Sequence, residues 1–525
     1  MMDYWAKAPM DRNQIALFSP TLDSWIPEDH PVRLFDEILS RLDWSSWESH
    51  YDGCVGQPPI HPRILAGVIL YGMSQGIRSS RSLERACANS LDYLWLTSGR
   101  SLDHSTLCNF RTQFRSELKE VFRQIGRISM AMGLIRLNQV GLDGTRIRAN
   151  NNRKKIFSAE TLEKQLAELD AQIETMFSEA QAADDQDQDL FGSTSTRSLP
   201  RKLSDLHKRK ETLEKALALE KKIQARRHRH PRVYRQVPRV PVTDPDSALL
   251  PNKEEGMAPN YTPTAAVDSH RGFIVDTDVN GDGYESQTTI PTVDRIEETF
   301  DKKPEKFLAD NAHGTGKNLQ ELEDRAIEAY IPPQNCAPAT DNPAQRDDLT
   351  KPVPQSEWGR LPRNRQFKNK LDKSAFLYQA SEDCYYCPMG RKLAYVGDYQ
   401  NKRTFRHVRV RKYLCPSCDP CALAGECLID RAKQRSITHD EYEPSRQNMR
   451  KRLDTAAGKK IYNCRQWICE TPFALIKEYL KFRQFLVRGL EKVKTEWLWV
   501  CTSFNLSKLV REITRMRAKF SAMIG

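Results

Sequence analysis

The sequence lacks the features of an exported or membrane-embedded protein. No run approaches the roughly 18 consecutive apolar residues that a membrane-spanning helix needs. The first residues, MMDYWAKAPMDRN, contain no apolar stretch of the kind that a secretory signal carries. The mean hydropathy is −0.66, which is on the polar side. We therefore expect a cytoplasmic protein without a membrane partner.

A reducing compartment also excludes a disulfide framework, although the chain has 13 cysteines. Six of them fall within 384–427, which indicates metal binding rather than cross-linking. Cys384 with Cys387, and Cys415 with Cys418, form two C-x2-C knuckles with the separation of a zinc-ribbon-like site of four thiolates. Cys421 and Cys427 extend the second group, so the choice of ligands stays open. The alternative is a set of reduced, buried, metal-free cysteines.

The chain also has fewer acidic than basic residues. The chain carries 81 Lys and Arg against 69 Asp and Glu, a formal charge of +12. A basic balance attracts polyanions, of which nucleic acid is the commonest, although charge alone is weak evidence. The length of 525 residues predicts two or three domains, and 39% hydrophobic content is ordinary for a globular protein.

Residues 1–135 have the pattern of a set of short helices. Helices are expected over 60–76, 80–89 and 91–97, and 117–135 continues in helical period. Asp103 has the chemistry of an N-cap for a basic helix over 106–116, which carries Arg111 and Arg115. Several short helices with a basic one late in the set resemble a DNA-binding helical domain. The alternative is a plain helical bundle with a solvated basic face.

The middle of the chain alternates between strands and helices. Strands are predicted over 139–148, 264–268, 272–279, 306–309 and 328–331, with helices over 288–299 and 316–327. The order is strand, hairpin of two strands, helix, strand, helix, strand. This order predicts a mixed sheet with helices, an α/β layer architecture.

Two segments interrupt this pattern. Residues 156–230 read as a charged helical hairpin with a floppy tip over 180–198, and 334–456 is rich in Pro and Asn before its Cys-rich part, 380–430. Residues 462–518 are helical again, with a break expected near Pro472 and an apolar core helix over 497–504. The predicted domains are 1–135, a core made of 136–333 and 457–525 that carries the hairpin, and an insertion of 334–456.

Two aspartates end predicted strands. Asp143 follows Val-Gly-Leu and precedes Gly-Thr, and Asp310 follows Phe-Leu-Ala. Carboxylates on rigid strand ends suit a pair of hard Mg²⁺ ions. Glu470 is a third candidate, seven residues before Lys477 and therefore on the same face of a helix. For each alone, a turn residue, a cap or a solvated charge is the alternative.

Several ordered segments resemble one known family. They are GQPPIHPRILAGVILYGMSQGIRSSRSLERACANSLDYLWLTSG, LDHSTLCNFR, VGLDGTRIRANNNRKK, TDPDS, NYTPTAAVD, KFLADNAHG, YNCRQWICETPFALIK and FRQFLVRGLEKVKTEWLWVCTSFNLSKL. Together they resemble the bacterial insertion-sequence transposases of the DDE class, whose catalytic core is RNase H-like. The match spans most of the chain outside the two inserted segments.

The resemblance implies a set of site residues. The family's three metal ligands fall on Asp143, Asp310 and Glu470, and its Tyr/Arg/Glu/Lys signature falls on Tyr462, Arg465, Glu470 and Lys477. Two departures occur. The spacing from Arg465 to Glu470 is one residue longer than usual, and Ala-His-Gly replaces the Gly-Tyr pair that commonly follows the second aspartate.

The resemblance also implies the reaction. Such an enzyme binds double-stranded DNA at the terminal inverted repeats of its element, hydrolyses the phosphodiester with two Mg²⁺ ions, for which Mn²⁺ is a substitute, and transfers the freed 3′-hydroxyl to target DNA. Lys477, Arg465 and Arg488 would hold phosphates, and Arg111 and Arg115 would contact DNA. A homodimer on nucleoid DNA is expected, because two ends must meet.

Two other functions remain open at this point. One is a catalytically inactive or domesticated transposase-derived protein that only binds DNA. The other is a metal-dependent nuclease that cuts DNA without joining it.

Overall fold

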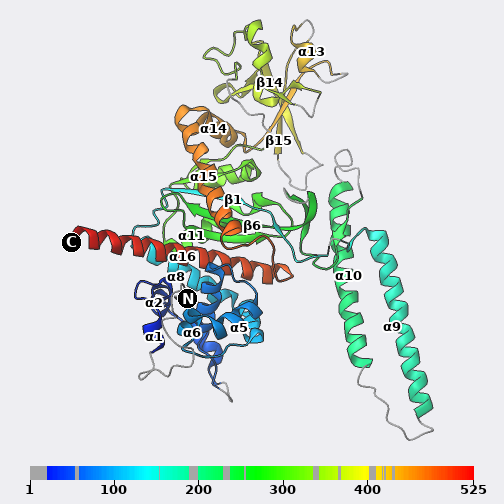
Figure 1. The fold of residues 1–525 in the computed structure, drawn as a ribbon. Helices are drawn as coiled ribbons and strands as arrows, with labels where there is room; N and C mark the ends of the chain where they lie inside the picture. Colours follow the sequence, from blue (N-terminus) through cyan, green and yellow to red (C-terminus); the bar gives the residue numbers. More distant parts are fainter. Residues whose placement is uncertain are drawn as a thin grey trace, which may run out of the picture. The chain divides into compact units, whose positions relative to one another are not determined.

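The structure, a computed structural model, describes residues 21–53, 58–152, 154–187, 199–228, 237–252, 256–334, 342–364, 368–400, 409–416, 418, 421–428 and 432–524. The chain divides into two compact units (Figure 1). The first contains the residues up to Ile125, together with Glu478–Lys481 and the chain from Leu498 onward. The second contains Gly126–Lys477 and Phe482–Trp497.

In the described residues of its N-terminal part, the first unit is helical. The helices are α1 (Leu22–Trp25), α2 (Pro31–Ser40), α3 (Ser45–Glu48), α4 (Pro62–Ser74), α5 (Ser80–Asn89), α6 (Leu91–Thr97), α7 (His104–Gln113) and α8 (Arg115–Ala131), which continues past Ile125. Asp103 caps α7 as expected, because its carboxylate accepts hydrogen bonds from the backbone N–H groups of Ser105 and Thr106 at 2.8 and 3.0 Å. The predicted basic helix therefore exists, but it begins two residues earlier and ends at Gln113.

The core of the first unit is aromatic. Trp47 is fully buried and stacks on Phe110 at a centroid distance of 4.9 Å, and Trp499 of α16 (Leu490–Ile524) lies 6.2 Å from both rings. Helix α4 is buried almost all round, which explains its continuous apolar sequence. The sequence assigned 457–525 to the catalytic core, whereas the part of α16 from Leu498 onward belongs to this unit.

A seven-stranded sheet forms the centre of the second unit. Its strands are β1 (Gln139–Gly144), β2 (Ile147–Arg148), β5 (Ala248–Asn252), β6 (Gly256–Asp268), β7 (Ile274–Asn280), β8 (Lys306–Ala309) and β9 (Glu328–Tyr330). The order across the sheet is β7-β6-β1-β8-β9, and β2 and β5 also pair with β6. Strand β6 runs antiparallel to β1 and β7, whereas β1, β8 and β9 run parallel. The predicted mixed α/β class is confirmed.

The central strands are apolar because both faces of the sheet are covered. Val140, Leu142, Phe307 and Leu308 are fully buried. The predicted helices of this region are present as α11 (Thr289–Phe300) and α12 (Gly316–Asp324), which link β7 to β8 and β8 to β9. The hairpin of β5 and β6 was not predicted, because Pro251 and Pro259 within it obscure the strand pattern.

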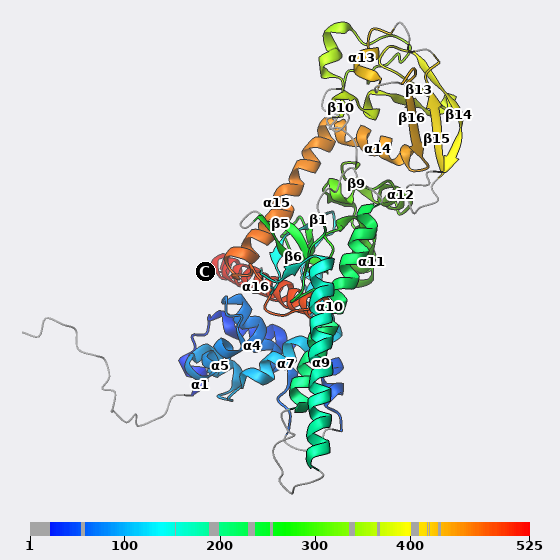
Figure 2. The same cartoon turned by 90° about the vertical axis from the view of Figure 1, so that its right-hand side faces the viewer.

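Helix α15 (Ala456–Glu478) packs against β1, as Figure 2 shows. The expected break near Pro472 is wrong, since α15 runs through it. Pro472 is buried and provides no N–H for the helix ladder, and the Thr471 hydroxyl donates to the carbonyl of Trp467 at 2.7 Å. Burial of the proline ring offsets the one missing helix bond. The helix ends instead before 479–489, where Lys481 and Gly489 have positive φ.

The charged segment forms the predicted helical hairpin. Helices α9 (Ala159–Asp187) and α10 (Leu199–His228) lie side by side (Figure 1) and bury their own apolar cluster around Leu162, Leu169 and Leu213. Strands β3 (Ile156–Phe157) and β4 (Val240–Pro241) pair at its base. Helix α9 extends nine residues beyond the predicted end at 178, and 188–198 of the expected tip lie outside the described residues.

The Cys-rich segment, 342–454, has its own core. A short pair, β10 (Arg363–Asn364) and β11 (Lys370–Leu371), accompanies a five-stranded antiparallel sheet of β12 (Leu377–Gln379), β13 (Cys384–Tyr386), β14 (Lys392–Gln400), β15 (Arg409–Leu414) and β16 (Ser436–Asp440). The helices are α13 (Ala424–Cys427) and α14 (Glu443–Asp454). Across the described residues, no helix is long and apolar enough to cross a membrane.

Candidate functional site

Two aspartates stand side by side at the end of two parallel strands. In the register of β1 and β8, Leu142 pairs with Ala309, so Asp143 and Asp310 are the next residues on neighbouring strands. Asp143 accepts a hydrogen bond from the Gly144 N–H at 2.8 Å, and Asp310 accepts one from the Ala312 N–H at 2.9 Å. These backbone bonds fix both carboxylates at the edge of the sheet.

The surroundings of Asp143 disfavour its negative charge. Burial raises the pKa of Asp143 above its ordinary value, Arg465 opposes this shift, and the negative charge of Asp310 adds to it. A pair of close, partly buried carboxylates favours a cation between or beside them. The pair is made of hard oxygen ligands, and it therefore fits the Mg²⁺ ions that the sequence predicts.

Helix α15 brings basic groups to this pair. The Arg465 guanidinium binds Asp143, with 2.9 Å between Nη1 and Oδ2, and it lies 5.9 Å from the centre of the Tyr462 ring. The Lys477 ammonium donates to the Thr145 hydroxyl at 2.7 Å. Residues 462, 465 and 477 lie within a sector of about 120° on an α-helix, so one side of α15 can present all three. The longer spacing between Arg465 and Glu470 does not remove Arg465 from the site.

Glu470 occupies a different position on the same helix. Its side chain is exposed and accepts a hydrogen bond from Gln466 at 3.5 Å. Its charge reaches Cys469, whose thiol pKa is raised by burial first and by the charge of Asp143 and other neighbouring groups, Glu470 among them. Cys469 faces β1. Among the described residues, the ligand atoms of Glu470, Asp143 and Asp310 do not all lie within 4.8 Å of one another, so the structure does not bring the third predicted ligand to the pair.

Two separate parts of the chain match known protein families. Residues 386–510 match the family model described as Transposase DDE domain, and residues 20–113 match the one described as Transposase domain (DUF772). The first match contains α15 with its Tyr/Arg/Glu/Lys residues, and the second contains the helices up to α7. No curated protein and no solved structure was found to match the chain.

The chain belongs to the DDE transposases of insertion sequences. Asp143 and Asp310 lie outside both matched ranges, so their assignment in this transposase depends on the geometry described above. The resemblance stated from sequence is confirmed at the level of the family.

Two further groups of the transposase lie beside Asp310, and the sequence analysis did not select them as ligands. The carboxylate of Glu285 lies over the β1 end, since a Cβ on Gly144 would stand 3.1 Å from the Glu285 Cδ. Burial and then the charge of Asp310 raise the Glu285 pKa to about 7, while Arg146 opposes the shift. His313 is fully buried, and burial lowers its pKa to about 4.

Of these two residues, only His313 could have been noticed from the sequence. His313 stands where family members commonly carry Gly-Tyr, and that departure marks it as unusual. Glu285 follows the Asn-Gly-Asp-Gly-Tyr segment, where nothing distinguishes it from a turn residue.

The predicted DNA-contacting arginines differ in their surroundings. Arg111 is buried, and its Nη1 donates to the Arg78 carbonyl at 2.6 Å, so it stabilises the helical unit from inside. Its position argues against a phosphate contact, which the basic pattern of α7 had suggested. Arg115 is half-buried at the start of α8. Arg488 is exposed, and its Nε donates to the Asn150 carbonyl at 2.9 Å.

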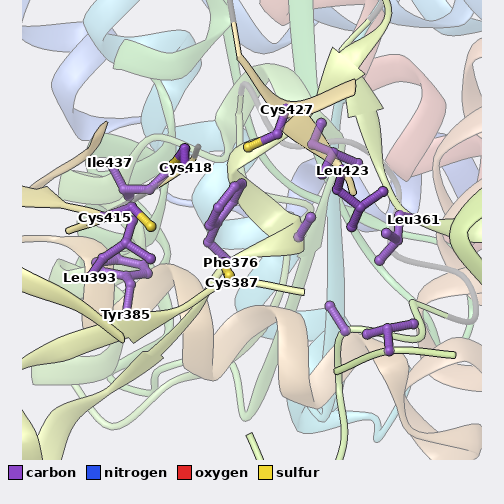
Figure 3. Packing of buried hydrophobic residues seen from close by; sticks show 14 of the residues in the cluster. Leu361, Phe376, Tyr385, Cys387, Leu393, Cys415, Cys418, Leu423, Cys427 and Ile437 are labelled. Carbon is purple, nitrogen blue, oxygen red and sulfur yellow. The ribbon is translucent and has the colours of Figure 1, made fainter. Parts of the chain in front are cut away.

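Five cysteines of the Cys-rich segment gather around one small cavity. Figure 3 shows four of them among apolar side chains such as Phe376 and Leu423. The cavity is lined by five cysteines: Cys387, Cys415, Cys418, Cys421 and Cys427. Cys384 does not line it, and its thiol contacts the Glu382 carboxylate at 3.8 Å. The structure thus groups the second C-x2-C knuckle and its two extensions with only one cysteine of the first.

The sulfur atoms in this cavity are electrostatic neighbours. Burial raises the pKa of Cys427 to about 12, Arg435 opposes the shift, and Cys418, Cys387 and Cys421 add to it. The backbone N–H of Arg435 donates to the sulfur of Cys418 at 3.4 Å. Buried thiols that repel one another's charge are stabilised when a metal ion replaces their protons.

Proposed function

We propose that this transposase binds the terminal inverted repeats of its own insertion sequence and cuts and joins DNA with divalent metal ions. The observation that carries the proposal is the placement of Asp143 and Asp310 on adjacent ends of the parallel strands β1 and β8. The strand order β7-β6-β1-β8-β9, with β6 alone antiparallel to the central strands, supports an RNase H-like core.

The chain's own residues account for the steps around the phosphate. Bound divalent ions would activate the attacking water or 3′-hydroxyl and stabilise the leaving oxygen. Asp143 and Asp310 would hold them, with Glu470 as the third ligand. Arg465 neutralises Asp143 before an ion arrives, and afterwards it is placed to hold a phosphate, as is Lys477.

Positioning supplies much of the rate in such a reaction. The aspartates sit on a buried sheet and the basic groups on a helix packed against it, so both sets move little relative to each other. Arg115 and Arg488 would extend the contact along the DNA backbone, which fixes the register of the duplex without reading its sequence.

The test is cleavage and joining of DNA that carries the ends of the element. Asp143→Asn and Asp310→Asn should each lower Mg²⁺-dependent cleavage by roughly 100-fold or more while DNA binding in a gel-shift assay persists. Asp301→Asn, at an exposed aspartate after α11, is the matched control and should cut normally. Full activity of Asp143→Asn would contradict the proposal.

The same assay separates the other functions. A wild-type chain that binds end DNA but never cuts it is a DNA-binding protein only. One that cuts but never joins the 3′ end to target DNA is a nuclease. Glu470→Gln should behave like Asp143→Asn, and normal cleavage by it would mean that another group provides the third ligand.

We also propose a structural Zn²⁺ in the Cys-rich segment. Five cysteines line the cavity and Cys384 does not, and the charges of Cys387, Cys418 and Cys421 act on Cys427, which supports these four as ligands over a set that includes Cys384. Four thiolates are the usual donors of a closed structural zinc site. Such an ion would stabilise the segment without taking part in phosphodiester chemistry.

A further inference from the structure

We infer that His313, Glu285 and Asp310 together form a binding site for a divalent transition-metal ion. The inference deepens the proposed function, because it adds an imidazole and a carboxylate to one side of the Asp143–Asp310 pair. The ligand atoms of these three residues all lie within 4.8 Å of one another. In the part of the second unit that the structure describes, no other His, Cys, Asp or Glu residues form such a group of three.

The imidazole gives independent evidence for a ligand. His313 is fully buried, and among the described residues its Nε2 has no hydrogen-bond partner. Nε2 lies 3.8 Å from Glu285 Oε2 and 3.9 Å from Asp310 Oδ1. These distances are too long for hydrogen bonds. Leaving such an atom buried without a partner costs free energy, so its environment requires an explanation.

A shared ion accounts for these distances. Ligand atoms about 2.1 Å from one ion lie roughly 3.0–4.2 Å from one another, depending on the angle between them. Separations of 3.8 and 3.9 Å fall within this range, and the Nε2 atom faces both carboxylates. An ion placed among the three atoms would give Nε2 the partner that it lacks.

The other ring nitrogen is held as in a metal-binding histidine. Nδ1 lies 3.0 Å from the Thr289 hydroxyl oxygen, which also accepts a hydrogen bond from Asn318 at 3.0 Å. The Thr289 hydroxyl has its own acceptor in the Ser286 carbonyl at 3.5 Å. Thr289 can therefore accept a hydrogen bond from the Nδ1–H group, which leaves the lone pair of Nε2 directed at the carboxylates.

The chemistry of the ligands specifies the kind of ion. Two carboxylates suit Mg²⁺ and Mn²⁺ alike, whereas an imidazole nitrogen favours a transition metal over Mg²⁺. Arg146 lies 3.8 Å from Glu285 on the far carboxylate oxygen, Oε1, and leaves Oε2 facing His313. The site should therefore bind Mn²⁺ more tightly than Mg²⁺.

The experiment is Mn²⁺ binding to the full-length, metal-free protein, followed by electron paramagnetic resonance. A second cluster, Glu84, Asp103 and His104 in the first unit, could also give a nitrogen signal. All variants are therefore made in a His104→Gln background. The parent should bind Mn²⁺ with a spin-echo modulation from a coordinated ¹⁴N nucleus.

The variants separate a ligand from a structural role. His313→Gln should abolish the ¹⁴N modulation and weaken Mn²⁺ binding roughly tenfold or more. Glu285→Gln should weaken binding to a similar degree but keep the modulation. Thermal unfolding without metal shows whether either variant is folded. A modulation that persists in a folded His313→Gln protein, or Mn²⁺ affinity within twofold of the parent, would overturn the inference.

The readout is independent of DNA cleavage. If the wild-type chain fails to cut end DNA but shows the ¹⁴N modulation, the proposed enzymatic function fails and the metal site stands. If the chain cuts with Mg²⁺ and the modulation is absent, the function stands and His313 is not a ligand.

Discussion

At the scale of single residues, burial controls the charge state of several histidines and carboxylates. His439 is buried between two tyrosines, with its Nδ1 2.9 Å from the Tyr385 hydroxyl and its Nε2 3.2 Å from that of Tyr413. Burial, followed by the charge of Lys373, lowers its pKa to about 4, although Glu443 opposes the shift. The folded chain therefore holds the neutral imidazole.

This histidine should make the folded chain sensitive to acid. Because its folded pKa is depressed, its stabilising contribution is present above about pH 6.5 and is lost as the pH falls through 4. The expected loss is on the order of 2 kcal/mol of unfolding free energy by pH 4. His439→Gln keeps a hydrogen-bonding side chain and should remove this part of the pH dependence, measured by urea unfolding at pH 7 and pH 4.5.

A matched substitution isolates the effect from all other titrating groups. His61→Gln replaces an exposed histidine of the first unit. It should keep the parent's difference in stability between the two pH values. An equal pH dependence in His439→Gln and the parent would show that the neutral imidazole contributes nothing to the acid response.

The site residues differ in how far sequence could reveal them. Asp143 and Asp310 follow short apolar runs, so the sequence predicts that each lies at the end of a strand. The parallel pairing of β1 and β8 then brings the two residues together. Glu285 and His313 reach the same place from η2 (Glu285–Gln287) and η3 (Asn311–His313), two short turns whose packing depends on tertiary contacts. No local pattern encodes such a contact. The burial of Arg111 could not be predicted from the sequence either, because a helix rich in basic residues is expected to expose them.

At the scale of elements, the contact of α15 with β1 determines the geometry of the site. A Cβ on Gly141 would lie 2.7 Å from the sulfur of Cys469 and 3.0 Å from Cγ2 of Ile468. Only glycine therefore allows the helix to approach the strand this closely. The approach places Arg465 on Asp143 and Lys477 on Thr145.

Gly141→Ala should push the helix away from the strand. We expect a loss of about 1–3 kcal/mol in unfolding free energy, as for overpacked cores, and a fall in DNA cleavage larger than the loss of folded protein explains. Urea unfolding and the end-cleavage assay measure the two effects. Adding Cys469→Ala removes the nearest obstructing atom and should restore part of both.

A glycine in open space provides the comparison. Nothing lies within 4 Å of a Cβ built on Gly359. Gly359→Ala should leave both stability and cleavage near the parent's values. Equal effects of the two alanine substitutions would mean that the helix–strand contact does not position the site.

The proposed zinc site also belongs to the scale of elements. The purified chain should contain one zinc ion, and Cys418→Ser or Cys427→Ser should lose it, lowering the melting temperature of the protein. Cys384→Ser and the exposed Cys108→Ser should retain it, as measured by metal analysis. Zinc retained in Cys427→Ser, or lost from Cys384→Ser, would contradict the proposed ligand set.

Element boundaries show where sequence reasoning succeeds. Two helices, α5 and α6, begin and end where the sequence pattern predicts. Pro472 misled the prediction for α15, because its ring is buried and this burial offsets the one missing helix bond. A rule about backbone hydrogen bonds does not include the free energy that burial of a side chain contributes.

At the scale of the whole molecule, the charge and the reaction together set the expected assembly. A formal charge of +12 favours a polyanion as partner. Such binding weakens as the salt concentration rises, because the release of counterions from DNA then gains less entropy. Strand transfer also requires both ends of the element in one complex. Under the proposed function, a single set of Asp143, Asp310 and Glu470 per chain would supply one site for one end, so two chains should act together.

We therefore expect a complex of two chains with two end duplexes. Analytical ultracentrifugation with end DNA of defined length should detect this mass at low salt, and the complex should dissociate as salt increases. Mixing wild-type chains with Asp143→Asn chains gives a sharper test, because each mixed dimer would hold one working site. If cleavage at one end continues while paired-end joining falls with the square of the wild-type fraction, two sites cooperate. A one-to-one complex that joins DNA at an undiminished rate in the mixture would mean that a single chain processes both ends in turn.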